Sequence, residues 1–306
     1  MARTGSQHTH TQGCSKMNAA RAGITPIAWL IAPSALLFAL FFFLPMGLMA
    51  MISLLTGNPV VQANVDFTTK YYRRILDDTY YFEVIWTTLR IGLLTTLAAL
   101  LIGYPLAHLM ARVRGRTAYA MLMMAVLTPM LTGIVVRTFA WMALLSDKGA
   151  INQALIGLGL ISKPLPLMYN EFSIVLGLTH IYVPYMVLTL VGVIGRIDER
   201  LEHAAQNLGA SPLRAFLEVT LPLSLPGILA GSLLVFALAI SAYVTPILMG
   251  GFQIMTLPML IYQQISSSFN VGFAAALGMV LLTISLVLVI AYNRILGLVS
   301  GQRDLQ

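Results

Sequence analysis

The polar stretch with the most chemical potential covers residues 202–222 and reads EHAAQNLGASPLRAFLEVTLP. It places carboxylates, a histidine, a glycine and a Ser-Pro pair between two long apolar runs. Catalytic patterns are missing from the sequence: there is no H-E-x-x-H zinc motif and no G-x-x-x-x-G-K-[ST] phosphate loop. The single cysteine, Cys14, excludes a disulfide framework and a cysteine metal site. We therefore expect a non-catalytic protein without metal or cofactor, whose polar segment makes contacts.

The local signals in this segment predict a hairpin of two helices over 198–222. Apolar side chains with helical i, i+3, i+4, i+7 spacing line one face: Leu201, Ala204, Ala205 and Leu208. Gly209 follows where a left-handed cap ends a helix, and Ser211-Pro212 is an N-cap with proline in the first turn. A second apolar stripe of Leu213, Phe216 and Leu217 runs to Leu221-Pro222. The alanines allow close approach of another surface, and Phe216 is an aromatic anchor.

The charge of the first arm bears on what the hairpin touches. An amphipathic loop can lie among lipid headgroups, but such helices usually carry Lys and Arg on their polar face. Here Asp198, Glu199 and Glu202 cluster near the helix start, where carboxylates complement the helix dipole. The acidic arm favours a protein partner, with the headgroup location as the alternative.

The rest of the chain has the composition of a membrane protein. It is 58% hydrophobic and 9% charged, against about 25% charged in soluble domains, and its mean hydropathy is +0.84. Six long apolar segments lie at roughly 26–53, 84–111, 118–145, 173–195, 225–250 and 272–297. Their length excludes barrel strands, so we expect an all-α protein with six transmembrane helices.

The cations give the orientation. Most Lys and Arg residues fall in the N-terminal tail, the run Arg112, Arg114 and Arg116, the segment 196–214 and the C-terminus. The positive-inside rule therefore places both termini and the hairpin in the cytoplasm, so the net charge of +7 indicates topology rather than nucleic-acid binding. The expected organisation is a disordered tail over 1–25, a six-helix transmembrane domain over 26–300 that includes the hairpin 198–222, and a short tail over 301–306.

Polar residues within the spans are the candidates for a solute pathway. Arg137 lies inside the third span, where an arginine costs about 2.5–3.5 kcal/mol and normally faces the bundle interior or a wet cavity. It is either a gate or a structural hydrogen-bonding residue. No predicted span has Asp or Glu in its middle, so a cationic solute would rely on aromatic faces. The pathway candidates are Arg137, Trp141, Tyr182, Tyr185 and Tyr243.

The hairpin resembles the EAA signature, E-A-A-x3-G-x9-I-x-L-P, of importer permeases in the ATP-binding-cassette (ABC) class. The matching residues are His203-Ala204-Ala205, Gly209, Val219, Leu221 and Pro222. His203 stands at the position of the signature Glu, with Glu202 one residue earlier, and Val219 replaces Ile. The spacing is unchanged, which favours the same hairpin.

Other stretches resemble the spermidine/putrescine-type branch, including TTLRIGLL from Thr87, VVRTFAWMALLSDKGAINQAL from Val135, IYVPYMVLTL and AYVTPILMGG. Arg137–Trp141 with Gly149 and Asn152 is similar to the first of its two permease subunits. The resemblance implies a bacterial inner-membrane protein working with a second permease subunit, two ATPase copies that bind ATP and Mg²⁺, a periplasmic solute-binding protein and membrane lipid, and no nucleic acid.

By the same resemblance, a separate ATPase would contact a defined set of residues. They are Glu202, His203, Ala204, Ala205, Leu208, Gly209, Ala210, Ser211, Pro212, Phe216, Leu221 and Pro222.

Two alternatives remain at the level of the sequence. The same machinery could import another small solute, such as an opine, a phosphonate or an amino-acid-like molecule. The chain could instead be an ion-coupled secondary transporter, but such proteins usually show a buried acidic residue in a span.

Overall fold

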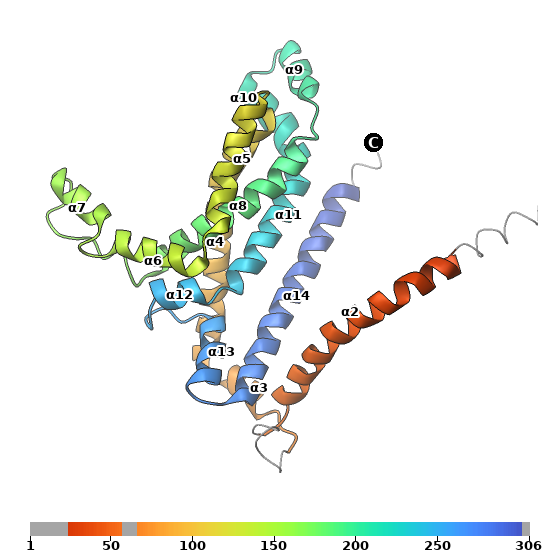
Figure 1. The fold of residues 1–306 in the computed structure, drawn as a ribbon, viewed down its shortest axis with the longest axis vertical. Helices are drawn as coiled ribbons and strands as arrows, with labels where there is room; N and C mark the ends of the chain where they lie inside the picture. The colour runs from red at the N-terminus through yellow and green to blue at the C-terminus, as the bar shows by residue number, and fades with distance from the viewer. Residues whose placement is uncertain (1–23, 57–65, 302–306) are drawn as a thin grey trace, which may run out of the picture. The chain divides into compact units, whose positions relative to one another are not determined.

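The computed structural model describes residues 24–56 and 66–301, and helices dominate them (Figure 1). The helices are α2 (Ile24–Ser53), α3 (Lys70–Asp77), α4 (Thr79–Arg112), α5 (Arg116–Leu131), α6 (Ile134–Leu145), α7 (Ala150–Gly157), α8 (Glu171–Ile194), α9 (Glu199–Asn207), α10 (Pro212–Ala215), the π-helix η1 (Phe216–Thr220), α11 (Leu221–Ile240), α12 (Val244–Met249), α13 (Leu257–Ser266) and α14 (Val271–Gly301). The described residues contain one isolated bridge, between Leu55 and Phe67, and no named strand. The all-helical prediction is confirmed.

The chain divides into two compact units, Met1–Ile52 and Ser53–Gln306. In the first unit α2 is a 30-residue helix that carries Pro33 and Pro45. Its bulky side chains, such as Phe38 and Phe41, are largely exposed in the described part of the helix. A helix that is apolar all round is typical of a membrane span.

Among the described residues, five helices are long and apolar enough to cross a membrane, and the number is six if the bent pair of α5 with α6 and α7 counts as one span. Instead of a continuous helix over 118–145, the chain bends by 94° between Leu131 and Ile134. Pro129 lies in the last turn of α5, and Thr132 and Gly133 are non-helical. The break falls after this proline, at Thr132 and Gly133, and glycine has one of the lowest helix propensities.

The fifth predicted span, 225–250, also differs, because α11 ends at Ile240 and α12 follows as a separate helix. Pro246 lies in the first turn of α12, where its missing N–H needs no partner. In a continuous helix the same proline would leave the carbonyl of Ala242 unbonded. The proline therefore suits the start of a new helix better than the interior of a long one.

The core of the second unit forms where α4, α8 and α11 pack side by side (Figure 1). Small residues set the spacing: a Cβ added at Gly103 of α4 would lie 3.0 Å from Met186 Cγ, and one at Gly231 of α11 would lie 2.7 Å from Met186 Sδ. Such small residues let membrane helices approach closely. A bulkier residue at either glycine would have to displace the buried side chain of Met186.

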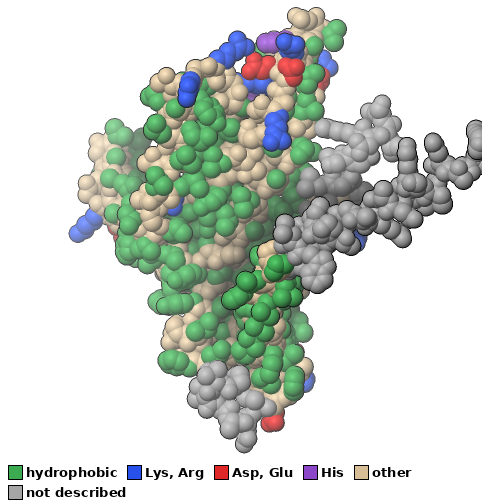
Figure 2. Space-filling view, turned by 45° about the vertical axis from the view of Figure 1, so that its right-hand side comes forward, with side chains coloured by type: hydrophobic (Ala, Val, Ile, Leu, Met, Phe, Trp, Pro, Cys, Tyr) green, Lys and Arg blue, Asp and Glu red, His purple; other side chains and the backbone are tan. Residues whose placement is uncertain are grey.

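A second cluster joins α3, α13 and α14 to the beginning of α4, around Tyr81, Leu257 and Phe273. Arg74 covers it, with its guanidinium carbon 5.0 Å from the centre of the Phe273 ring. This cluster lies at the end of the unit opposite α9 and α10 (Figure 1). Charged side chains gather instead at the end that carries α9, while apolar side chains cover much of the flank below (Figure 2).

Candidate functional site

The hairpin between α8 and α11 is built on a tight corner at Gly209. Asp198 caps α9 by accepting from the N–H of Arg200 at 2.9 Å. At the other end the N–H of Gly209 donates to Gln206 O at 2.9 Å, and the N–H of Ala210 donates to Ala205 O at 3.1 Å. Gly209 has a φ of +96°, in the left-handed region that favours glycine. This is a glycine-terminated helix end of the Schellman type.

The second arm starts as expected and then widens. Ser211 accepts from the N–H of Arg214 at 3.3 Å, and Pro212 occupies the first turn of α10. Residues 216–220 then form a π-helix rather than the α-helix that the pattern predicted, with the N–H of Leu221 bonded to Phe216 O. Pro222 has no N–H to offer the carbonyl of Glu218, so an α-helical ladder would be incomplete here.

Arg112, the last residue of α4, joins the core of the bundle to α9. Its Nη2 lies 2.9 Å from Glu202 Oε1, and its Nη1 lies 3.7 Å from Glu199 Oε1. Nη1 also donates to Ile197 O at 3.3 Å. The side chains of Arg112 and Glu202 are only 18% and 20% exposed. Charge-assisted hydrogen bonds of this kind are among the stronger polar contacts in proteins.

Two further contacts complete this ion-pair network. Arg114 Nη2 donates to Glu199 Oε2 at 2.9 Å, and Thr220 of the π-helix donates to Glu202. The hydrogen bond from Arg114, helped by the charges of Arg112 and His203, holds the pKa of the Glu199 carboxyl below its usual value. Sequence reasoning missed this network, since it used the arginines only for orientation. The sequence did contain a signal for this network: Glu199 and Glu202 are three residues apart on a predicted helix, and Arg112 and Arg114 form an Arg-x-Arg run.

Phe216 lies inside the joint between the hairpin and the bundle. Its half-buried ring packs edge-on against Tyr104 at 5.8 Å and His108 at 5.3 Å between ring centres. The Tyr104 hydroxyl also bonds to Ser224 Oγ of α11 at 2.8 Å. Phe216 thus ties η1 to α4, whereas the sequence pattern offered it as an anchor for a partner.

Leu208, at the corner itself, is the most exposed apolar side chain of the hairpin at 90%, and Leu213 is exposed beside it. The remaining predicted contact residues divide by burial. The exposed ones are His203, Ala204, Gly209, Ser211 and Pro212, and the partly buried ones are Glu202, Ala205, Ala210, Phe216, Leu221 and Pro222.

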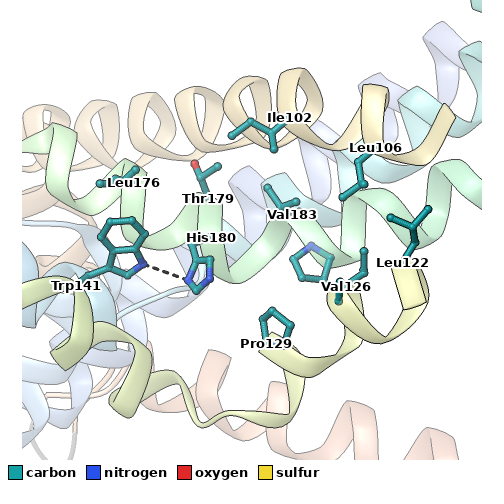
Figure 3. Close-up of a pocket in the computed structure, with 12 residues that line it drawn as sticks. Ile102, Leu106, Leu122, Val126, Pro129, Trp141, Leu176, Thr179, His180 and Val183 are labelled. Carbon is teal, nitrogen blue, oxygen red and sulfur yellow. Dashed lines mark hydrogen bonds between the residues drawn. The ribbon is translucent and has the colours of Figure 1, made fainter. Parts of the chain in front are cut away.

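The pathway candidates fall into separate places. Trp141 of α6 donates from Nε1 to His180 Nδ1 of α8 at 3.1 Å, and both line an apolar cavity of about 360 Å³ between α4, α5, α6 and α8 (Figure 3). Tyr243 does not line this cavity; it directly precedes α12, and its ring stacks on Tyr262 with 5.3 Å between ring centres.

Arg137 lies one turn before Trp141 and is only 9% exposed. Its Nε and Nη1 have no hydrogen-bond partner among the described residues. Tyr182 and Tyr185 of α8 are near enough to interact with it electrostatically, and Tyr182 donates to Leu238 O at 3.1 Å. The structure therefore brings Arg137 together with the two tyrosines.

The described residues thus contain a helical unit with a glycine-cornered hairpin between two long spans. Residues 101–297, which include this hairpin, match the family described as the binding-protein-dependent transport system inner membrane component. The chain belongs to this family.

Individual relatives agree over most of the chain. It is 32% identical over 283 residues to the spermidine/putrescine transport system permease protein PotB of Escherichia coli (strain K12), covering 92% of this chain and 99% of the relative. It is 30% identical over 266 residues to PotB of Haemophilus influenzae, covering 87% and 92%.

A solved structure shares the fold. The crystal structure of a bacterial alginate ABC transporter, in complex with an alginate pentasaccharide-bound periplasmic protein, contains a chain that matches with a TM-score of 0.72 at 18% identity. The match covers 88% of this chain and 94% of that one. The protein is thus a multi-pass permease subunit of the bacterial inner membrane and is not itself an enzyme.

Proposed function

We propose that this chain forms half of the transmembrane pathway of an ABC importer for a polyamine such as spermidine or putrescine. The polyamine assignment rests on the transport system named for its relatives at 30–32% identity. The proposed complex adds a second permease subunit, two copies of an ATPase that bind ATP and Mg²⁺, a periplasmic solute-binding protein and surrounding lipid. The proposed topology has six spans with both termini and the hairpin in the cytoplasm.

One observation carries the coupling role: the hairpin is fastened to the bundle on one side and presents an apolar corner on the other. Arg112 and Arg114 fix α9 to the end of α4, and Phe216 fixes η1 to the same helix. Leu208 and Leu213 take no part in these ion pairs or ring contacts and are exposed. Because the chain has no phosphate loop, free energy must enter through contact with a partner. A force on the corner would then reach α4 and α11 together.

The coupling role is tested by placing a charge on the corner. Burying a leucine is worth about 1.5–3 kcal/mol, so Leu208→Glu should weaken ATPase association by tenfold or more. Leu158→Glu is the matched control, because Leu158 occupies the same position at the end of α7 and is also exposed. Co-purification in mild detergent gives the readout. If wild type, Leu208→Glu and Leu158→Glu all retained the ATPase equally, the corner at Leu208 would not be part of the interface with the ATPase.

The solute is tested separately with the complete transporter in proteoliposomes that hold ATP inside and binding protein outside. Labelled spermidine should accumulate and be displaced by excess putrescine, but not by an opine or by 2-aminoethylphosphonate. Uptake of a phosphonate or opine without competition from polyamines would overturn the polyamine assignment and leave the coupling role intact.

A further inference from the structure

We propose that a cavity at the outer end of α8 binds an ammonium group of the transported amine on its way into the pathway. The inference rests on the proposed polyamine function. The cavity has a volume of about 470 Å³, within the usual range for small-molecule sites. It is lined by Met142, Ser146, Asp147, Pro166, Met168, Tyr169 and Gln253. These residues come from the end of α6, the segment before α8 and the segment after α12.

The position of the cavity suits an entry site. Tyr169 directly precedes Asn170, the N-cap of α8, whereas the hairpin follows the other end of that helix. A helix of 24 residues is about 36 Å long, which exceeds the hydrocarbon thickness of a bilayer. With the hairpin in the cytoplasm, the cavity lies on the outer side, where a solute is released by the binding protein.

Asp147 supplies a negative charge. It forms no ion pair or hydrogen bond with another side chain among the described residues. Lys148 follows it in the chain, but Lys148 does not line the cavity. The apolar cavity near Trp141 and His180 has no charged residue among its described lining (Figure 3). Of the two cavities, the one at Asp147 therefore has the charge that an ammonium ion requires.

Tyr169 supplies an aromatic face, held in place by its backbone. Its φ is +60°, which is unfavourable for a bulky side chain and persists only where the surroundings enforce it. Its N–H donates to Met249 O at 2.9 Å, and a Cβ added at Gly251 would lie 3.1 Å from Tyr169 Cδ1. The side chain is still 49% exposed. A fixed, accessible tyrosine ring next to a carboxylate is well suited to bind a cation.

The remaining lining suits the aliphatic part of such a ligand. Met142 and Met168 offer flexible, polarisable side chains to methylene groups, and the Gln253 carbonyl can accept an N–H. A carboxylate, an aromatic face and thioethers together match a linear alkylammonium ion. A carboxylated or phosphonate solute would instead meet the charge of Asp147 unfavourably.

The test measures spermidine binding to the detergent-free permease–ATPase complex in nanodiscs, without binding protein. Asp147→Asn should weaken binding by about tenfold, whereas Asp77→Asn, at an exposed aspartate of α3, should leave it unchanged. Tyr169→Gly should weaken binding about two- to fivefold. Because glycine adopts a positive φ freely, relief of the backbone strain offsets part of the lost packing and the added chain entropy. A melting temperature close to that of the wild type would show that weaker binding does not reflect misfolding.

The outcomes separate the site from the function. Wild-type affinity in both Asp147→Asn and Tyr169→Gly, with polyamine uptake intact, would overturn the site alone. A wild-type complex that neither binds nor transports polyamines would overturn the proposed solute. A lysine of the binding protein offers the same alkylammonium chemistry. Loss of binding-protein docking in Asp147→Asn with unchanged spermidine affinity would assign the cavity to that lysine and overturn the proposal.

Discussion

The protein uses the same Leu-Gly corner twice, at Leu208–Gly209 after α9 and at Leu158–Gly159 after α7. In both, the glycine N–H bonds three residues back and the following N–H bonds five residues back, at 2.9–3.1 Å. Both glycines have positive φ, +96° and +70°, and both leucines are exposed, at 90% and 74%. In the proposed topology the two corners lie on opposite sides of the membrane.

The corners differ in what holds them. Arg112 and Arg114 tie α9 to α4, a helix of the core. By contrast, the α7 corner is tied by the buried amide of Asn152, whose side-chain hydrogen bonds among the described residues go to the backbone of Ser146 and Leu165, in the segments flanking α7, at 2.9–3.2 Å. The same backbone corner can therefore occur in two different settings. The side chains that anchor the adjoining helix determine whether a movement of the corner is transmitted to the core helices or stays within its own segment.

Of the changes that test this difference between the two corners, reversing the charge of Arg112 should have the largest effect. In Arg112→Glu, two carboxylates of α9 face a third, and breaking a largely buried pair costs about 3 kcal/mol. Solute uptake per ATP hydrolysed should fall severalfold, and Arg112→Glu combined with Glu202→Arg should recover much of it.

The exposed pair Arg214–Glu218 in the same hairpin is the control, since such i,i+4 pairs contribute about 0.3–0.5 kcal/mol. Arg214→Glu should leave coupling nearly unchanged. If both reversals reduced coupling equally, general charge in the hairpin, and not the tie to α4, would be responsible.

Removing the amide at the other corner should have the next largest effect, confined to its loop. Asn152→Ala leaves backbone groups of Leu165 and Ser146 without their partner, at about 1–3 kcal/mol per unsatisfied group. Amide hydrogen exchange should speed up over 150–165 while exchange over α9 stays unchanged. Faster exchange in α9 as well would show that the two corners are mechanically connected.

Replacing Gly209 and Gly159 with valine should distinguish the effect of backbone strain from a loss of coupling to the ATPase. A left-handed conformation costs an L-residue about 1–2 kcal/mol, and neither site has any atom within 4 Å of an added Cβ. Gly209→Val and Gly159→Val should therefore lower thermal stability by similar amounts, but only Gly209→Val should reduce ATPase activity coupled to transport. Equal transport in the two variants would remove the hinge role of Gly209.

The smallest expected effect concerns pH. Because the folded pKa of Glu199 is lowered, its ion pair contributes fully above the ordinary carboxyl pKa and is lost as pH falls through the lowered value. Hydrogen exchange of α9, corrected for intrinsic rates, should accelerate across that acidic window. Glu199→Gln should show the faster exchange already at neutral pH and a flatter profile, and a profile identical to wild type would contradict this.

The sequence predicts the hairpin well because its signals are local. Gly209, Ser211-Pro212 and the apolar period each act within a few residues. The contact between Arg112 and Glu202 spans 90 positions, and no local pattern states which face of α4 meets α9. The bend after Leu131 was missed for another reason: hydropathy does not distinguish a straight apolar helix from two joined at an angle.

The pathway candidates were harder to place than the hairpin. Residue type alone grouped Tyr243 with Tyr182 and Tyr185, and it could not predict that the ring of Tyr243, after the end of α11, stacks on Tyr262. Asp147 and Tyr169 gave no periodic signal, because both lie in loops. Their proximity follows from the tertiary packing of α6, α8 and α12.

The π-helix at Phe216–Thr220 sets the number of residues between α10 and α11. Each residue added to or removed from a helix rotates everything after it by about 100°. Because a π-helical turn already holds one residue more than an α-helical turn, a further one-residue insertion there would carry Ser224 away from Tyr104 and turn Gly227 and Gly231 off the surface of α8. Exposed positions of this stretch should thus tolerate substitution far better than a further insertion.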